Sequence, residues 1–178
     1  MQAQWPFTYK KMILLLDLAP VVLPDPSKRL RFLAMLCLQW QLIGRVNNTQ
    51  KVQVHNFSFS NDQPQTIRCR LTWSKNISEE RKAPQQMLIG SMESKICVLQ
   101  ALASYLEQQF EATASTRESF IFGTGNDSNQ FARAALTKIF ALDAFASSDK
   151  GSLDTHSISK GAATYALQNG VVKDHVNL

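Results

Sequence analysis

The sequence predicts an α+β domain that is mainly helical and contains a small antiparallel three-stranded sheet. Apolar residues recur at helical spacing before residue 41, alternate with polar residues between Lys51 and Ile89, and return to helical spacing from Ile96 onward. Helices on both sides of a short run of strands are typical of the α+β class.

Two amphipathic helices are expected in the first part of the chain. Met12, Leu15 and Leu16 mark the first, and the second runs from Leu30 to Trp40. Ser27 is the expected N-cap of the second helix. Residues 20–27, with three prolines, are expected to form the loop between these helices.

The sheet and the later helices follow from the same patterns. Strands are expected at residues 51–57, 66–73 and 86–89, with a turn at Asn61-Asp62-Gln63-Pro64. Helices are expected from Ile96 to Phe110, from Phe131 to Leu142, and from Thr155 to a C-cap at Gly170. Residues 113–129, rich in Ser, Thr, Gly and Asn, are expected to be a loop.

The composition fits one globular domain spanning residues 1–178. The chain is 44% hydrophobic and 19% charged, which excludes a disordered or fibrous protein. Its apolar runs are too short for a membrane span or a signal peptide, so we expect an intracellular protein that does not bind membranes. Cys37, Cys69 and Cys97 lie far apart without a CxxC motif, so we expect buried thiols, no metal site and no cofactor.

Positive charge is concentrated in the first half of the chain. Residues 1–82 hold 12 Lys and Arg against 5 Asp and Glu, a net charge of +7, whereas residues 83–178 hold 7 against 9, a net charge of −2. Such asymmetry suits a surface that binds a polyanion such as nucleic acid, although a generally basic domain would also show it.

Three segments carry a more specific pattern. LQWQLIGRVNN at residues 38–48 is a helix followed by a lone arginine. TWSKN at residues 72–76 ends a predicted strand, and Arg81 and Pro84 follow it. THSISKGAATY at residues 155–165 has a histidine, two further residues and then a helix of small residues. In this order and spacing, the segments resemble the catalytic domain of the tyrosine recombinases, the DNA breaking and rejoining fold of phage integrases, and especially divergent members from eukaryotic mobile elements.

The resemblance implies a site for phosphodiester transfer. Arg45 matches the first phosphate-binding arginine, Lys75 matches the lysine that protonates the leaving oxygen, and His156 matches the histidine of the third segment. In isolation, these residues would be interpreted as a helix-end arginine, a solvated turn lysine and a histidine near a helix start.

The chain departs from the family pattern at several positions. Ser159 stands where the family has its second arginine, and a hydroxyl cannot form a bidentate fork to a phosphate. Lys160 is adjacent but is expected to point elsewhere. Asn47 and Asn48 stand where an acidic residue usually supports the first arginine. The chain also has no tyrosine where the family has its nucleophile, since its tyrosines are residues 9, 105 and 165.

Further contacts to DNA are expected from basic residues outside these segments. The candidates are Lys28, Arg29, Arg31, Arg68, Arg70 and Lys160, which could equally be solvated surface residues. Arg68 and Arg70 should share one face of their strand.

The leading hypothesis is a degenerate tyrosine recombinase domain that binds double-stranded DNA without strand cleavage, with an ancestral role in DNA integration or site-specific recombination. It would be nuclear in a eukaryote, and assembly into a homo-oligomer on DNA remains open. The alternatives are a domesticated protein-interaction module on the same fold and a truncated fragment of an active recombinase.

Overall fold

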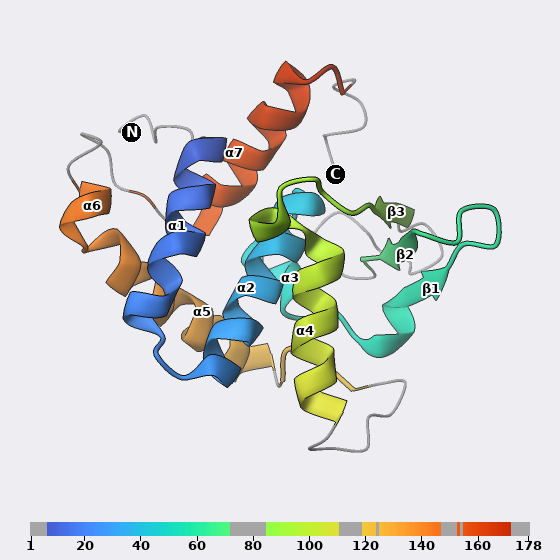
Figure 1. Ribbon diagram of the computed structural model, residues 1–178, viewed down its shortest axis with the longest axis horizontal. Helices are drawn as coiled ribbons and strands as arrows, with labels where there is room; N and C mark the ends of the chain where they lie inside the picture. The colour runs from blue at the N-terminus through green and yellow to red at the C-terminus, as the bar shows by residue number, and fades with distance from the viewer. Residues whose placement is uncertain are drawn as a thin grey trace.

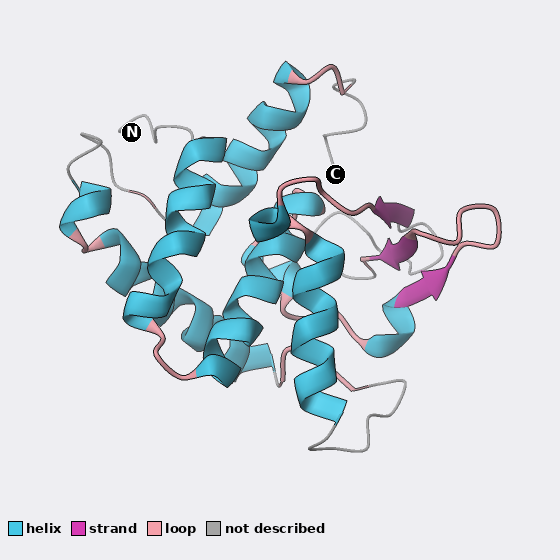
Figure 2. Cartoon of the chain, viewed as in Figure 1, coloured by secondary structure: helices cyan, strands magenta, loops and turns pink. Residues whose placement is uncertain are grey.

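The computed structural model describes residues 7–71, 85–110, 119–123, 125–146, 153 and 155–171. It is mainly helical with one small sheet (Figures 1 and 2), as predicted. The helices are α1 (Tyr9–Val22), α2 (Pro26–Gln41), α3 (Val46–Thr49), α4 (Val98–Phe110), α5 (Gly125–Phe140), α6 (Asp143–Ala146) and α7 (Thr155–Gln168). The 3-10 turns η1 (Val54–Asn56) and η3 (Ser94–Ile96) precede β1 and α4, and the strands are β1 (Phe57–Phe59), β2 (Ile67–Arg70) and β3 (Gln85–Leu88).

Helix α2 forms the centre of the molecule. Every residue from 34 to 40 is buried, because this stretch (AMLCLQW) carries no charge and a helix that is apolar on all sides must be enclosed. Helices α1, α4 and α7 pack directly against it (Figure 1). The core therefore surrounds α2, and Gln39 is the polar residue within its buried run.

The sheet lies beside α4 and the end of α2 (Figure 2). Its order is β1-β2-β3, and both neighbouring pairs are antiparallel. Cys69 in the central strand is fully buried, so Arg68 and Arg70, which alternate with it, lie together on the opposite face as predicted. Strand β3 agrees closely with its prediction, while residues 72 and 73 of the second predicted strand lie outside the described residues.

The first predicted strand, at residues 51–57, is largely wrong. Lys51 lies in a turn, Gln53 forms only an isolated bridge with Phe120, and the 3-10 turn Val54–Asn56 precedes β1, which begins at Phe57. The Oδ1 atom of Asn56 accepts a hydrogen bond of 2.8 Å from the backbone N–H of Gln53. Such a local bond gives the backbone an alternative to pairing in a sheet.

The loop predicted at residues 20–27 is shorter than expected. Helix α1 continues to Val22 with Pro20 inside it, although proline lacks the N–H that would bond to the carbonyl four residues earlier. Helix α2 begins at Pro26, and its N-cap is Asp25 rather than Ser27. The carboxylate of Asp25 accepts the backbone N–H of Ser27 at 2.9 Å, as expected of a capping aspartate before a proline.

Two other expectations are corrected, and two short helices are present that the sequence did not predict. The loop predicted at residues 113–129 ends early, because α5 begins at Gly125. Helices α3 and α6 have four residues each, too few to produce a periodic apolar pattern. Cys37 and Cys69 are buried, but Cys97 is only partly buried.

The segment before α1 packs closely on α7. Phe7 is 1% exposed, and its ring stacks on Phe145 with the ring centroids 6.2 Å apart and contacts Trp40 edge-on at 6.4 Å. A Cβ atom at Gly161 of α7 would lie 1.8 Å from the backbone oxygen of Phe7. Only glycine therefore allows this close approach.

Candidate functional site

The turn that carries Arg45 is a Schellman motif at the end of α2. The backbone N–H of Gly44 donates to the Gln39 carbonyl at 3.0 Å, and the N–H of Ile43 donates to the Trp40 carbonyl at 3.2 Å. Ile43 takes the left-handed position, with a φ of 51°, where glycine is usual. A branched residue in this conformation costs about 1–3 kcal/mol, and such strain often lies at functional sites.

Arg45 is the N-cap of α3 and is exposed to solvent. Its carbonyl accepts the N–H groups of Asn48 at 2.9 Å and Thr49 at 3.1 Å, and the Thr49 hydroxyl at 3.2 Å. Within the described residues its guanidinium has no ion pair. The backbone of Arg45 is thus held firmly, while its side chain faces solvent and can bind an anion.

The first turn of α7 carries His156 and is attached to the same end of α2. The side-chain amide of Gln39 donates to the Thr155 carbonyl at 3.3 Å, and this contact is buried. Thr155 itself is buried, and the next residue, His156, is exposed. The contact links positions 116 residues apart in the sequence and brings the backbones of the Arg45 turn and the His156 turn to one end of α2.

The sheet reaches the same end of α2 through Gln86 of β3. Its side-chain amide donates to the carbonyl of Leu42, the C-cap of α2, at 3.3 Å. The last carbonyls of a helix have no partner within the helix, so this bond also caps α2. Lys75, together with Arg81 and Pro84, lies outside the described residues, but β2 and β3 border that segment.

The third segment has two features that bear on charge. The Ser159 hydroxyl donates to the His156 carbonyl at 3.1 Å, so the residue at the second arginine position is bonded to its own helix and carries no charge. Lys160 is exposed and lies four residues after His156, on the same side of α7. The expectation that Lys160 points away from the neighbouring Ser159 position stays a prediction.

The basic residues at the start of α2 do not adjoin this site. Helix α2 has 16 residues and is therefore about 24 Å long, and Lys28, Arg29 and Arg31 lie at the end opposite to Arg45. Arg31 donates to the Ser128 hydroxyl at 2.8 Å and covers the Phe131 ring at 4.8 Å from its centroid. Arg29 donates at 3.5 Å to carbonyls of the loop before the helix. These two arginines therefore stabilise local structure.

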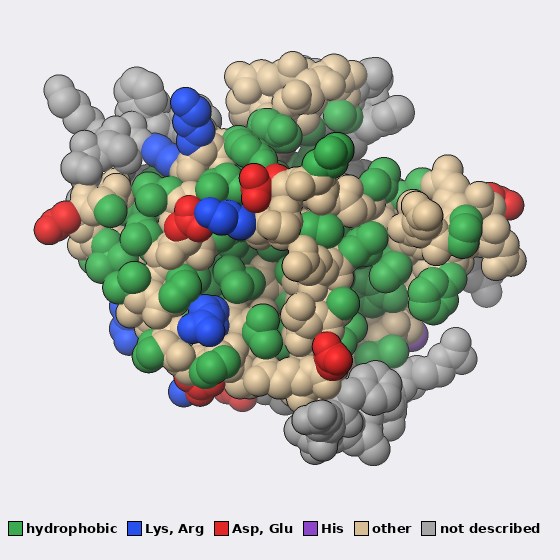
Figure 3. Space-filling view, viewed as in Figure 1, with side chains coloured by type: hydrophobic (Ala, Val, Ile, Leu, Met, Phe, Trp, Pro, Cys, Tyr) green, Lys and Arg blue, Asp and Glu red, His purple; other side chains and the backbone are tan. Residues whose placement is uncertain are grey.

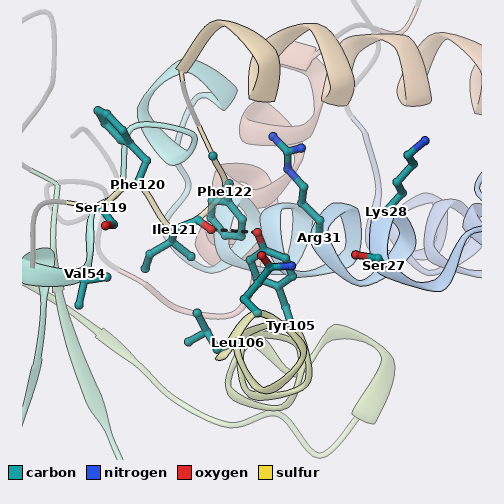
Figure 4. Close-up of a pocket in the computed structure, with 12 residues that line it drawn as sticks. Ser27, Lys28, Arg31, Val54, Tyr105, Leu106, Ser119, Phe120, Ile121 and Phe122 are labelled. Carbon is teal, nitrogen blue, oxygen red and sulfur yellow. Dashed lines mark hydrogen bonds between the residues drawn. The ribbon is translucent and has the colours of Figure 1, made fainter. Parts of the chain in front are cut away.

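A hollow of about 360 Å³ lies beside Arg31, between α2, α4 and residues 119–123 (Figure 4). The hydroxyl of Tyr105 donates to the Ile121 carbonyl at 2.9 Å within it, and Lys28 extends away from this group. Because it lies at the start of α2, the hollow is separate from the Arg45 site.

Arg68 and Arg70 on β2 differ in their contacts. Arg68 donates to the Ser60 hydroxyl at 3.0 Å and pairs with Asp62 at 3.4 Å, which holds it within its own hairpin. The Nε atom of Arg70 is buried and has no hydrogen-bond partner in the described part of the chain. On the face shown in Figure 3, the described Lys and Arg side chains are few and spread over the surface, with one lying between acidic groups, so the described part of this face has no extended basic patch.

Sequence reasoning missed Gln39, Gln86 and Gly161, which hold the segments together. A polar residue inside the apolar run of α2 was the one available signal for Gln39, and nothing comparable distinguished the other two. Among the described residues, no group of His, Cys, Asp and Glu could hold a metal ion, and no helix is long and apolar enough to cross a membrane.

Comparison with known proteins supports the fold. No protein-family model matches the sequence, and no curated protein matches it. Among solved structures, the chain is similar to the XerH site-specific recombinase bound to difH substrate in a pre-cleavage complex, with a TM-score of 0.65 and 14% sequence identity. The match covers 93% of this chain and 43% of the recombinase chain, so this chain spans less than half of that protein. The chain thus has a fold like that of the tyrosine recombinase catalytic domain.

Proposed function

We propose that this domain binds duplex DNA through a phosphate site formed by Arg45, His156 and Lys160, and that it does not cleave the strand. The observation that carries the proposal is the convergence of the Arg45 turn, the His156 turn and β3 on one end of α2, in a fold like that of a site-specific recombinase. Lys75 lies outside the described residues, and we propose that it adds a further contact to the phosphate.

Physical chemistry supports a phosphate ligand. Arg45 offers an exposed guanidinium on a held backbone, and a planar guanidinium forms paired hydrogen bonds with phosphate oxygens. His156 and Lys160, one helical turn apart, are both exposed and add donors on the neighbouring element. Neutralising several phosphates and releasing their counterions is the main source of non-specific affinity for DNA.

The proposed lack of cleavage is supported by Ser159. Strand cleavage builds charge on the phosphate oxygens, and removing one charged contact to that transition state commonly costs about 3–4 kcal/mol. The Ser159 hydroxyl, bonded to the His156 carbonyl, supplies no such charge.

The proposal also covers the evolutionary origin of the domain. We propose a domain descended from an integrase of a mobile element, which acts inside the cell and, in a eukaryote, in the nucleus. The order of the Arg45, Lys75 and His156 segments supports this descent.

The test is duplex-DNA binding by fluorescence anisotropy across a salt series, comparing Arg45→Gln with Lys28→Gln. Both variants lose one positive charge, but Lys28 lies about 20 Å along α2 from the end of the helix next to Arg45, beyond the screening length of about 10 Å at 0.1 M salt. Arg45→Gln should weaken binding about 10- to 100-fold and make the salt slope shallower by about one, whereas Lys28→Gln should change the affinity less than about threefold.

Three other outcomes would change the conclusion. Equal losses in both variants would indicate diffuse attraction to the basic half of the chain rather than a site at Arg45. No binding by the wild type even at low salt would refute the proposal and favour the protein-interaction alternative. A covalent adduct with a nicked duplex would contradict the proposed lack of cleavage.

A further inference from the structure

Gln39 has contacts that differ from those of every other residue in the buried run of α2. It is 1% exposed. Its backbone carbonyl accepts the Gly44 N–H at 3.0 Å, which closes the turn before Arg45. Its side-chain amide donates to the Thr155 carbonyl at 3.3 Å, immediately before His156.

A glutamine is an unfavourable choice for packing alone at this position. Burying an amide costs free energy unless its hydrogen bonds are made, and Leu or Met would fill the same space at lower cost. The neighbouring buried residues are apolar, so the amide of Gln39 is the exception that needs an explanation. Its contact with Thr155 supplies one, because it fixes how far α7 lies from the end of α2.

We infer that Gln39 is a positioning residue that holds the Arg45 turn and the His156 turn at the separation needed to contact one phosphate. The inference rests on the proposed function. A single residue acts on both turns, through its carbonyl on one and its amide on the other. Gln86 holds β3 at Leu42 in a similar way, but it touches neither the Arg45 turn's closing bond nor α7.

The test uses Gln39→Met, which keeps the side-chain length and burial but removes the donor. Leu38→Met is the matched control, since Leu38 is fully buried in the same helix and the change conserves volume. Gln39→Asn keeps an amide but shortens it by one methylene, and it replaces Gln39→Met if that variant does not fold. Circular dichroism and thermal unfolding establish that each variant is folded.

The first readout needs no DNA. The ring ¹H–¹³C NMR signals of His156, assigned with His156→Gln among the three histidines of the chain, should shift in Gln39→Met and stay in place in Leu38→Met. A variant that is folded and leaves the His156 signals unchanged would overturn the inference. This result is independent of whether the domain binds DNA at all.

The second readout is a double-mutant cycle with Arg45→Gln in the anisotropy assay. Loss of a positioning hydrogen bond should weaken DNA binding about two- to tenfold. If Gln39 acts through Arg45, the double variant should bind as weakly as Arg45→Gln alone. Additive losses would show that Gln39 contributes only general stability, and no wild-type binding would refute the proposed function while the NMR result still decides the role of Gln39.

Discussion

Replacing Gly161 with alanine tests the packing that places α7. In a free helix, Gly→Ala stabilises by about 1 kcal/mol, because alanine is the better helix former. In this protein the added Cβ would lie 1.8 Å from the Phe7 oxygen and 2.7 Å from its carbonyl carbon. Both atoms belong to the backbone, so no side-chain rotation can relieve the overlap.

The magnitude follows from what must move. An ordinary contact between a carbon and an oxygen is about 3.4 Å, so the two backbones must move apart by about 1.5 Å. A gap of only about 0.5–1 Å already removes a quarter to a half of the dispersion energy between the facing atoms. Complete loss of a buried phenylalanine costs about 3–5 kcal/mol, and Phe7 is 1% exposed. Subtracting the gain in helix propensity leaves an expected loss of about 1–3 kcal/mol.

The assay is urea unfolding followed by circular dichroism, with Ala163→Gly in the same helix as control. The control should lose about 1 kcal/mol, the cost of glycine in a helix. Gly161→Ala should lower the midpoint even though its helix propensity improves. A midpoint equal to or above that of the wild type would refute the close approach of Phe7 to α7.

Three further predictions concern the buried Tyr105 hydroxyl and the three thiols. Tyr105→Phe removes the 2.9 Å bond to the Ile121 carbonyl and should cost about 1–2 kcal/mol in thermal unfolding; a loss below about 0.5 kcal/mol would mean that the bond contributes little. Burial raises the pKa of the Cys37 and Cys69 thiols to about 12, whereas in the unfolded chain they ionise near about 8.5. Stability should therefore fall as the pH rises above about 8.5, because the unfolded state loses protons first, and Cys69→Ala should make this fall shallower; an unchanged pH dependence would contradict it. Burial alone would raise the pKa of Cys97, but backbone N–H donors lower it overall, so Cys97 should be the thiol of the three that reacts fastest with a disulfide reagent in the folded protein.

The basic residues separate into different roles only in three dimensions. A count of charges does not distinguish Arg31 from Arg45. In the structure, Arg31 donates a hydrogen bond to Ser128, whereas Arg45 faces solvent without an ion pair among the described residues. Only Arg45 lies at the end of α2 where the other candidate segments meet. The net charge of the first half is thus a poor guide to a binding surface.

The sequence by itself determined the α+β class, the central helix, α4, α7 and β3. These elements have strong local signals: a long apolar run, helical periodicity, or alternation next to turn residues. Weak or very short sequence patterns did not predict the structure. At residues 51–57 the local hydrogen bond between Gln53 and Asn56 stabilises a 3-10 turn instead of a strand. The helices α3 and α6 have only four residues each and were not predicted.

Only the tertiary structure decided how the candidate site is assembled. The motif order identified Arg45 and His156 separately, but the contact that joins their turns, from Gln39 to Thr155, spans 116 residues of sequence. The need for glycine at position 161 depends on Phe7, which comes from the other end of the chain. Local patterns report the conformation of a few neighbouring residues, whereas contacts such as these exist only after the core around α2 has packed.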